Sequence, residues 1–304
     1  MKISIIGAGQ VGATTALKIL ENKLAKEEVV LLDIIEGLPQ GKALDLAQSG
    51  YSVKITGSND YSKMEGSDIV VITAGIPRKP GMSRSDLIGI NANIIKDVMK
   101  NVVTYAGNSI IIMVSNPLDI MTYLAYKVSK FPAARVIGMS GVLDTFRFKT
   151  FVSWELNMAA QDVQALVLGG HGDSMVPLIR YATVGGVPLT QLLSKESIDK
   201  IIERTKNGGA EVVSYLKTGS AFHSPAESVT LMVAAIAHNQ RRLLPVSAFL
   251  NGEYGAKDLY IGVPAILGKN GVEKVIELKL NEEELSALQK SMDDVVNDIK
   301  KLEI

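Results

Sequence analysis

One histidine stands in a segment made mostly of small residues, Gly169-Gly170-His171-Gly172-Asp173-Ser174. The segment follows a hydrophobic run, Val163–Leu168, which predicts a strand that ends at a site. Imidazole titrates near neutral pH, and glycines beside it leave room for a substrate. Of the chain's three histidines, His171 is therefore the best candidate for a general acid and base, with a histidine that only packs a turn as the simpler alternative.

A second set of residues is suited to bind a dinucleotide. The run Ile3–Ile6 predicts a strand, which leads into Gly7-Ala8-Gly9-Gln10-Val11-Gly12 and a helical pattern to about Asn22. Such glycines allow a tight turn and a close approach to a pyrophosphate, which the helix N-terminus attracts. A second strand, Val29–Leu32, leads to Asp33, where the adenosine ribose should bind.

Asp33 also indicates which dinucleotide binds. Its carboxylate can accept hydrogen bonds from ribose hydroxyls but would repel a 2′-phosphate. No Lys or Arg follows before Lys42 to neutralise such a phosphate. The sequence therefore predicts NAD, and not NADP, as the cofactor.

Alternating strand and helix patterns in the first half must position these groups. We expect strands near Ser52–Thr56, Asp68–Thr73, Ser109–Val114 and Arg135–Ile137, with helices at Asn91–Tyr105 and Leu118–Val128. Buried strands separated by helices predict a parallel sheet covered on both faces, with ligands at the carboxyl ends of its strands. The expected cofactor-binding residues are Gly7, Gly9, Gln10, Val11, Gly12, Asp33, Thr73, Gly75, Asn91, Val114 and Asn116.

The regular alternation stops near Gly141, where a helical pattern to Asn157 begins a mixed half. The sequence thus predicts a Rossmann doubly wound parallel sheet as NAD-binding domain, residues 1–140, and a mixed α+β catalytic domain, residues 141–304. In the second half we expect helices at Lys195–Arg204, Ala210–Leu216 and Pro225–His238, strands near Leu243–Leu250, Leu259–Gly262 and Val272–Leu278, and a terminal helix capped by Asn281.

Composition narrows the class of protein. The 304 residues carry 32 basic and 32 acidic side chains, so charge gives no reason to expect nucleic acid or an anionic membrane as a partner. The absence of cysteine excludes disulfides and cysteine-ligated metals. Because the three histidines are scattered along the chain, we do not expect a metal site. No signal peptide and no apolar run of about 20 residues is visible, so we expect a cytoplasmic enzyme.

Three basic residues occupy a turn-rich segment after a predicted strand end, Ile76-Pro77-Arg78-Lys79-Pro80-Gly81-Met82-Ser83-Arg84. The segment predicts an exposed loop beside the cofactor, and its arginines suggest an anionic substrate over which the loop closes. Without the glycine motif, a solvated basic loop would be the simpler interpretation.

With these motifs the sequence resembles the lactate/malate dehydrogenase superfamily from end to end, and most closely its malate dehydrogenases of the lactate-dehydrogenase type. The resemblance implies NAD-dependent, reversible oxidation of (S)-malate to oxaloacetate, a reaction of the tricarboxylic acid cycle. The segments that carry it are Gly7–Gly12, Asp33, Gly75–Arg84, Val114–Asp119, Gly141–Arg147, Gly169–Ser174, Gly262–Pro264 and Gly268–Gly271.

The resemblance implies a role for each residue of the catalytic centre. His171 looks like the catalytic base and acid, and Asp144 looks like its carboxylate partner. Arg147 is similar to the arginine that grips the 1-carboxylate of the substrate. Asn116 resembles the asparagine that orients substrate and nicotinamide.

Two further arginines bear on the substrate. Arg84 looks like the residue that polarises the reacting carbonyl, and Arg78 like the residue that reads the far end of the substrate. Lactate dehydrogenases of the family carry glutamine where Arg78 stands, and pyruvate would leave that arginine unpaired at a cost on the order of 2–5 kcal/mol. Malate is therefore expected; the alternatives are an L-lactate or other 2-hydroxy-acid dehydrogenase and a catalytically silent NAD-binding module.

Other features bear on assembly and on the pocket wall. A helix from Glu36 to Ala47 carries small residues, and because this region forms a dimer contact in the family, we expect a homo-oligomer, dimer or tetramer. Ala221 leaves room for a larger substrate tail. The pair Phe222-His223 departs from the tyrosine pair usual in relatives, and we expect His223, like His238, to be structural.

Overall fold

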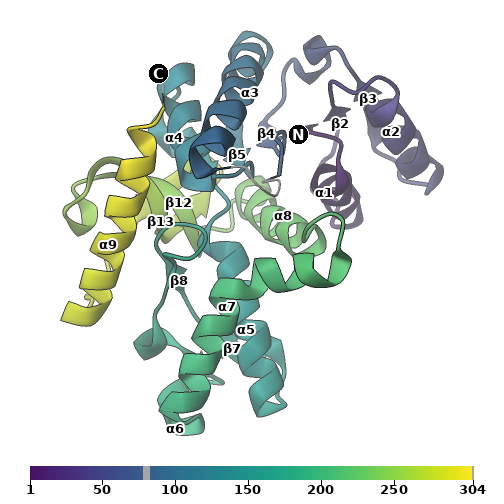
Figure 1. Cartoon of the computed structure of the whole chain (residues 1–304). Helices are drawn as coiled ribbons and strands as arrows, with labels where there is room; N and C mark the ends of the chain where they lie inside the picture. The colour runs from purple at the N-terminus through teal and green to yellow at the C-terminus, as the bar shows by residue number, and fades with distance from the viewer. Residues whose placement is uncertain (78–82, 303–304) are drawn as a thin grey trace.

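The computed structural model describes residues 1–77 and 83–302, and its first half forms a parallel sheet (Figure 1). The strands of this half are β1 Lys2–Ile6, β2 Glu28–Leu32, β3 Lys54–Ser58, β4 Ile69–Ile72, β5 Ile110–Met113 and β6 Val136–Gly138. They lie in the order β6-β5-β4-β1-β2-β3, and all neighbours pair in parallel. Strand order reverses between β1 and β4, which opens a crevice at their carboxyl ends, as in a Rossmann fold.

Strands from the second half extend the same sheet. They are β12 Arg242–Asn251, β13 Lys257–Gly268 and β14 Gly271–Val275. β12 pairs antiparallel with β6 through Ser247 and Gly138, and β13 and β14 follow antiparallel, giving nine strands within the described residues. The large sheet therefore contains strands from both sides of the boundary expected at residue 140.

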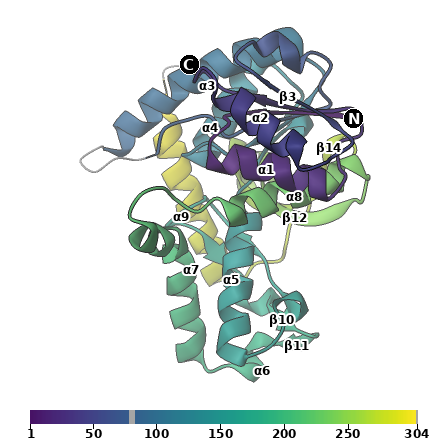
Figure 2. The ribbon, with the colours of Figure 1, turned by 90° about the vertical axis from the view of Figure 1, so that its right-hand side faces the viewer.

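Helices cover both faces of this sheet (Figure 2). β4 shows why, because all its side chains are fully buried and alternate ones belong to cores on opposite faces: Ile69 and Val71 to one, Val70 and Ile72 to the other. The first core includes residues of α1 (Gln10–Glu21) and α8 (His223–Ala237), and the second includes residues of α3 (Arg84–Tyr105) and α4 (Leu118–Ser129).

A third core lies in the lower part of the molecule, away from the large sheet (Figure 1). It is built mainly around Phe148 and Val152 of α5 (Gly141–Leu156) and Ile198 and Ile201 of α7 (Lys195–Leu216). The remaining elements are α2 Leu38–Gln48, β7 Val163–Gln164, β8 Val167–Leu168, β9 Val176–Pro177, β10 Thr183–Val184, β11 Val187–Pro188, α6 Leu189–Leu192 and α9 Glu282–Ile299, with 3-10 turns at Tyr61–Met64, Ala133–Arg135, Ala160–Asp162, Ile179–Tyr181 and Glu253–Gly255.

The strand expected over Val163–Leu168 is wrong as one element. Its start, β7, pairs with β10, whereas its end, β8, pairs with β9. The chain changes partner in between, and the hydroxyl of Thr145 on α5 accepts a hydrogen bond from the Val167 N–H at 3.1 Å. A mostly apolar run cannot report such a change of partner, because hydrophobicity does not show which strand each piece pairs with.

Two helices also differ from expectation. Lys195–Arg204 and Ala210–Leu216 are one helix, α7, which passes through Gly208 and Gly209 and whose two halves run in different directions (Figure 1). α3 begins at Arg84, well before the expected Asn91, because Ser83 and Asp86 form a reciprocal capping box at its N-terminus. Arg84 therefore opens a helix and does not belong to the preceding loop.

The C-terminal helix agrees with its sequence pattern. Asn281 caps α9, with a capping box to Glu284, and Leu288, Met292 and Val295 are buried. Within residues 1–77 and 83–302, no helix is both long and apolar enough to cross a bilayer.

Candidate active site

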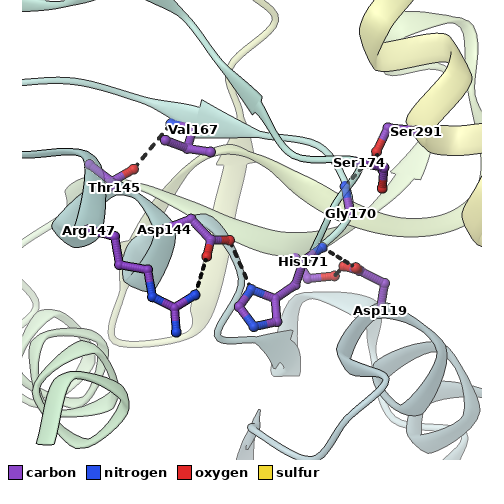
Figure 3. A network of polar contacts seen from close by, with 10 residues as sticks. Asp119, Asp144, Thr145, Arg147, Val167, Gly170, His171, Ser174 and Ser291 are labelled. Carbon is purple, nitrogen blue, oxygen red and sulfur yellow. Dashed lines mark hydrogen bonds and ion pairs between the residues drawn. The ribbon is translucent and has the colours of Figure 1, made fainter. Parts of the chain in front are cut away.

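The imidazole of His171 contacts a buried carboxylate. Its Nδ1 lies 2.9 Å from Oδ2 of Asp144, whose side chain is 1% exposed (Figure 3). Burial alone would lower the pKa of His171, but the Asp144 carboxylate outweighs burial and the net pKa is raised. This contact fixes the ring and supports its protonated form, while Nε2 stays available for a substrate.

Asp144 and Arg147 share one face of α5. They are three residues apart, and Nη1 of Arg147 donates to Oδ1 of Asp144 at 3.2 Å. Asp144 lies in the first turn of α5, where the helix N-terminus favours its negative charge. Among the described residues, Asp144 is the partner of this guanidinium, which leaves most of its planar donor set for a carboxylate.

The side chain of Arg147 lies against α7 where that helix carries its two glycines. A Cβ atom on Gly208 would lie 3.1 Å from Cδ of Arg147, and one on Gly209 would lie 3.4 Å from Nη2. Glycine inside a helix costs about 1 kcal/mol relative to alanine, but here it lets the helix approach the guanidinium closely. The pair lies between the two helices that the sequence predicted, and its contact with Arg147 was not predicted.

The segment that carries His171 is tied to three other elements (Figure 3). Gly169 exchanges backbone hydrogen bonds with Gly262 of β13, at 2.9 and 3.2 Å. The N–H of Gly170 donates to Ser291 Oγ on α9 at 2.8 Å, and the N–H of His171 donates to Asp119 Oδ2 on α4 at 2.9 Å. Together with Asp144 on α5, these contacts give the imidazole a fixed position.

Asp119 and Ser291 are functional candidates that sequence reasoning missed. Asp119 fell inside a motif that resembles the family but received no role, and Ser291 sits among core positions of the C-terminal helix. The one signal in the sequence was that each is a polar residue among largely apolar helix positions. The structure shows that both side chains are buried. A buried polar side chain requires a partner, but the sequence does not say which one.

The glycine-rich turn has the shape that a pyrophosphate requires. Gly7 has φ +102°, and the Thr73 hydroxyl donates to its carbonyl oxygen at 2.9 Å. A Cβ atom on Gly12 would overlap the Gly7 carbonyl, whereas one on Gly9 would meet no atom within 4 Å. Gly9 thus borders open space at the N-terminus of α1, where N–H groups are free to bind an anion.

Asp33 lies at the other side of this groove. Its Oδ2 accepts from the Ala8 N–H at 2.7 Å and its Oδ1 from the Ile35 N–H at 3.0 Å, so each oxygen keeps capacity for a ribose hydroxyl. A cavity of about 610 Å³ connects Asp33 with the glycine turn. Of the expected cofactor residues, it is lined by Gly7, Gly9, Gln10, Val11, Asp33, Thr73 and Gly75.

A second cavity, of about 630 Å³, adjoins the first and is lined by several of the predicted catalytic and substrate-binding residues. Arg147 and His171 line it together with Asn116. It shares residues with the dinucleotide groove, so the two form a continuous cleft with room for a dinucleotide and a small substrate. The shared residues are Val11, Thr73, Gly75, Ile76, Gly219 and Ser220.

Other expected site residues differ in position. Val114 lines the second cavity, and so does Ala221, whose small side chain fits the expected room for a substrate tail. Asn91 is 1% exposed and lines neither cavity; its side chain instead hydrogen bonds the backbone of Ile76 and the carbonyl of Asn116. Asn91 therefore joins two loops that border the cleft.

The two arginines of the basic segment cannot be placed. Arg78 lies outside the described residues, and for Arg84 only the backbone position, at the start of α3, is described. In the second half, His223 opens α8 with its ring centroid 4.1 Å from that of Phe222, and His238 follows the end of α8. Among residues 1–77 and 83–302, no group of three or more His, Cys, Asp or Glu side chains could hold a metal ion.

Both halves of the chain that form the cleft match a known protein family. Residues 1–138 match the family model for the lactate/malate dehydrogenase NAD binding domain, and residues 141–303 match that for the lactate/malate dehydrogenase alpha/beta C-terminal domain. A protein from Chlorobium limicola named malate dehydrogenase is 57% identical over 295 residues, covering 96% of this chain and 95% of the relative.

Solved structures agree with this match. A malate dehydrogenase from Cryptosporidium parvum superposes with a TM-score of 0.96 at 44% identity, covering 99% of this chain and 98% of the other. A lactate dehydrogenase from the same organism, complexed with lactic acid and nicotinamide adenine dinucleotide, gives 0.94, also at 44% identity, with 98% and 96% covered. The fold is thus common to enzymes named for two different substrates.

Proposed function

Because the chain belongs to the lactate/malate dehydrogenase family, we propose that it catalyses the reversible oxidation of (S)-malate to oxaloacetate with NAD. The observation that carries this proposal is the contact series His171–Asp144–Arg147 in a cleft continuous with the dinucleotide groove. The expectation of NAD is confirmed by the match to the family's NAD-binding domain. The expected malate dehydrogenase agrees with relatives of that name at 53–57% identity.

The residues of the dinucleotide groove fit the expected cofactor. Gly9 and the N-terminus of α1 would hold the pyrophosphate, and Asp33 would accept hydrogen bonds from the adenosine ribose. NAD bound there would accept a hydride at its nicotinamide ring. Val11 and Thr73, which line both cavities, border the passage from this groove to the catalytic residues.

His171 would hold and move the proton of the reaction. In malate oxidation its Nε2 takes the hydroxyl proton, and in oxaloacetate reduction it returns that proton to the carbonyl oxygen. Asp144 fixes the tautomer and stabilises the imidazolium through Nδ1. Asn116, on the cavity wall, would orient the substrate carbonyl toward His171.

Two arginines would select a dicarboxylate. Arg147 would bind the 1-carboxylate with its planar fork, held against α7 and Asp144. Arg78 would bind the second carboxylate, and Arg84 would polarise the reacting carbonyl; support for both comes from their places in the motif that resembles the family. Pyruvate would leave Arg78 without an anionic partner.

Lactate dehydrogenase is the second candidate, but it is not favoured, because the relatives at 53–57% identity are named malate dehydrogenase. The lactate dehydrogenase from Cryptosporidium parvum matches the fold almost as well as the malate dehydrogenase does. Arg78 is what argues against it, since the fold does not distinguish the two. A silent NAD-binding module has less support, because it has no use for a buried Asp144 that joins an imidazole to a guanidinium.

Assembly and cellular role form a further part of the proposal. We propose a homo-oligomer, supported by exposed apolar side chains at and before α2: Leu44 is 61%, Ile34 85% and Ile35 58% exposed. A monomer by light scattering at micromolar concentration would contradict it. A cytoplasmic location and a role in the tricarboxylic acid cycle rest on the resemblance, and cell fractionation followed by malate dehydrogenase assay tests the first.

The experiment that tests the function compares two substrates. Rates of NADH oxidation are measured with oxaloacetate and with pyruvate at equal concentrations. The proposal predicts a large preference for oxaloacetate, because only this substrate supplies two carboxylates. Comparable or faster turnover of pyruvate would identify a lactate dehydrogenase. Turnover of neither substrate would favour a dehydrogenase for another 2-hydroxy acid or a catalytically silent NAD-binding module.

A further inference from the structure

Asp119 is a buried carboxylate next to His171 that the proposed reaction does not use. It lies in the first turn of α4 and is 3% exposed. Its Oδ2 accepts a hydrogen bond from the backbone N–H of His171 at 2.9 Å (Figure 3). Its Oδ1 accepts a hydrogen bond from the hydroxyl of Ser247 on β12 at 2.7 Å. One carboxylate thus joins the catalytic histidine to a helix and to the large sheet.

Both oxygens of the Asp119 carboxylate accept a hydrogen bond, which supports its ionised form against the effect of burial. Burial raises the pKa of Asp119, and the donors Ser247 and His171 oppose that rise without cancelling it. The N-terminus of α4 adds a positive partial charge beside the carboxylate. An asparagine at this position could keep both contacts, with Oδ1 accepting the His171 N–H and Nδ2 donating to the Ser247 hydroxyl oxygen, so the property that only Asp119 supplies is its negative charge.

The charges around the imidazole are arranged unequally. Asp144 from α5 contacts Nδ1, and Asp119 from α4 holds the histidine's own backbone. Arg147 from α5 and Lys206 from α7 line the substrate cavity, as does Asp173 of the histidine's own loop. The imidazole therefore has two buried carboxylates near it, of which only Asp144 touches the ring.

We propose that Asp119 is a positioning residue for the reaction: an ionised carboxylate that fixes the backbone of His171 and adds a second negative charge that stabilises its imidazolium. This proposal rests on the proposed role of His171. Asp119 acts through the histidine, since its two oxygens are engaged by His171 and Ser247 and it does not line the substrate cavity.

The consequence has a definite sign. Oxaloacetate reduction requires imidazolium, so its rate falls as pH rises through the pKa of His171. Removing the charge of Asp119 lowers that pKa, because the carboxylate is one of the charges that raise it. In Asp119→Asn the pH at which the rate of oxaloacetate reduction begins to fall should therefore be lower than in wild type. At pH values above this fall the variant should be up to roughly tenfold slower than wild type, and at pH values below it the rates should be similar. Malate oxidation, which needs neutral imidazole, extends to lower pH.

Ser291→Ala is the matched control. It removes the hydrogen bond to the N–H of Gly170, one residue before His171, without changing any charge. If Asp119 serves only to hold the loop, the two variants should behave alike. If its charge matters, only Asp119→Asn shifts the pH at which the rate begins to fall.

The direct test is a histidine titration by NMR of wild type, Asp119→Asn and Ser291→Ala. The chain has three histidines, and the His171 signal is assigned by its loss in His171→Asn. The proposal expects His171 to titrate at lower pH in Asp119→Asn than in wild type, with Ser291→Ala unchanged. An unchanged His171 titration in Asp119→Asn, or an equal shift in both variants, would overturn it.

This test separates the inference from the proposed function. The titration does not require turnover. A wild-type protein that is inactive on oxaloacetate would contradict the proposed function, and the effect of Asp119 on the titration of His171 could still be measured. Active wild type with an unshifted Asp119→Asn would sink the inference alone. Asp119→Ser is a second neutral variant should Asp119→Asn not fold.

Discussion

The two ends of the cleft are built in different ways. The dinucleotide end uses the backbone of one continuous segment, Gly7–Gly12, with a single side chain, Asp33, from the next strand. The catalytic end uses side chains from α4, α5 and α9 around His171, and α7 supplies the wall behind Arg147. One end is local in sequence, and the other is assembled by the fold.

This difference predicts how each end responds to mutation. A backbone site fails when an added atom blocks the approach of the ligand, and such changes should alter cofactor affinity. A side-chain site fails when a charge or its support is lost, and such changes should alter substrate affinity or the proton transfer. Variants at one end should therefore leave the other end nearly intact.

Among the substrate-binding and cofactor-binding residues, the largest effect is expected at Arg147. Arg147→Lys keeps the positive charge but loses the planar fork, so kcat/KM for oxaloacetate should fall by roughly 10²- to 10⁴-fold. The dissociation constant of NADH, measured by fluorescence titration, should stay within about twofold because the dinucleotide end is untouched. A parallel loss of NADH affinity would show that the two ends are not separable.

Arg78→Gln should change the choice of substrate. Removing the second cation relieves the penalty for pyruvate and removes the partner of the distal carboxylate. The ratio of kcat/KM for oxaloacetate to that for pyruvate should fall by roughly 30- to several-thousand-fold. Lys79→Gln is the neighbouring control, expected to keep the ratio of wild type; an unchanged ratio in Arg78→Gln would mean that Arg78 does not read the substrate.

Gly9→Ala tests the dinucleotide end. The added methyl group meets no protein atom within 4 Å, so the thermal unfolding temperature should not change. It would occupy the space through which a pyrophosphate approaches the backbone, so NADH affinity should fall by roughly tenfold or more. Unaltered NADH binding would place the pyrophosphate elsewhere.

The smallest effect is expected at α7. Gly208→Ala would press a methyl group against Cδ of Arg147, so KM for oxaloacetate should rise by roughly 3- to 30-fold with a smaller change in kcat. Gly89→Ala in α3 is the matched control, because its methyl group meets nothing within 4 Å and should stabilise the protein by roughly 0.5–1 kcal/mol. Equal kinetics in the two variants would show that the glycine pair does not support Arg147.

The same contrast explains what the sequence could predict. The alternation of strands and helices, the glycine turn and Asp33 follow from local patterns, because period, length and turn chemistry are properties of neighbouring residues. His171 and Asp144, 27 positions apart, were paired through the resemblance to the family, and the structure shows their contact. No local pattern predicts that contact.

What the sequence could not predict is the support of the site. Asp119 meets His171 across 52 positions and Ser291 meets Gly170 across 121, so each contact depends on tertiary packing. The sequence pattern predicted two helices, Lys195–Arg204 and Ala210–Leu216, but the structure has one helix that continues through Gly208 and Gly209, where it packs against Arg147. The extension of the sheet by β12–β14 could not be predicted either, because the sequences of β6 and β12 do not show that these two strands pair.

The measurement that tests this account most directly is made on His171→Asn. The asparagine fills a similar space but cannot transfer the proton, so oxaloacetate turnover should fall by at least roughly 10²- to 10⁴-fold. NADH should bind with the dissociation constant of wild type, because the histidine lies at the other end of the cleft. Turnover close to that of wild type would remove His171 from the mechanism and contradict the account.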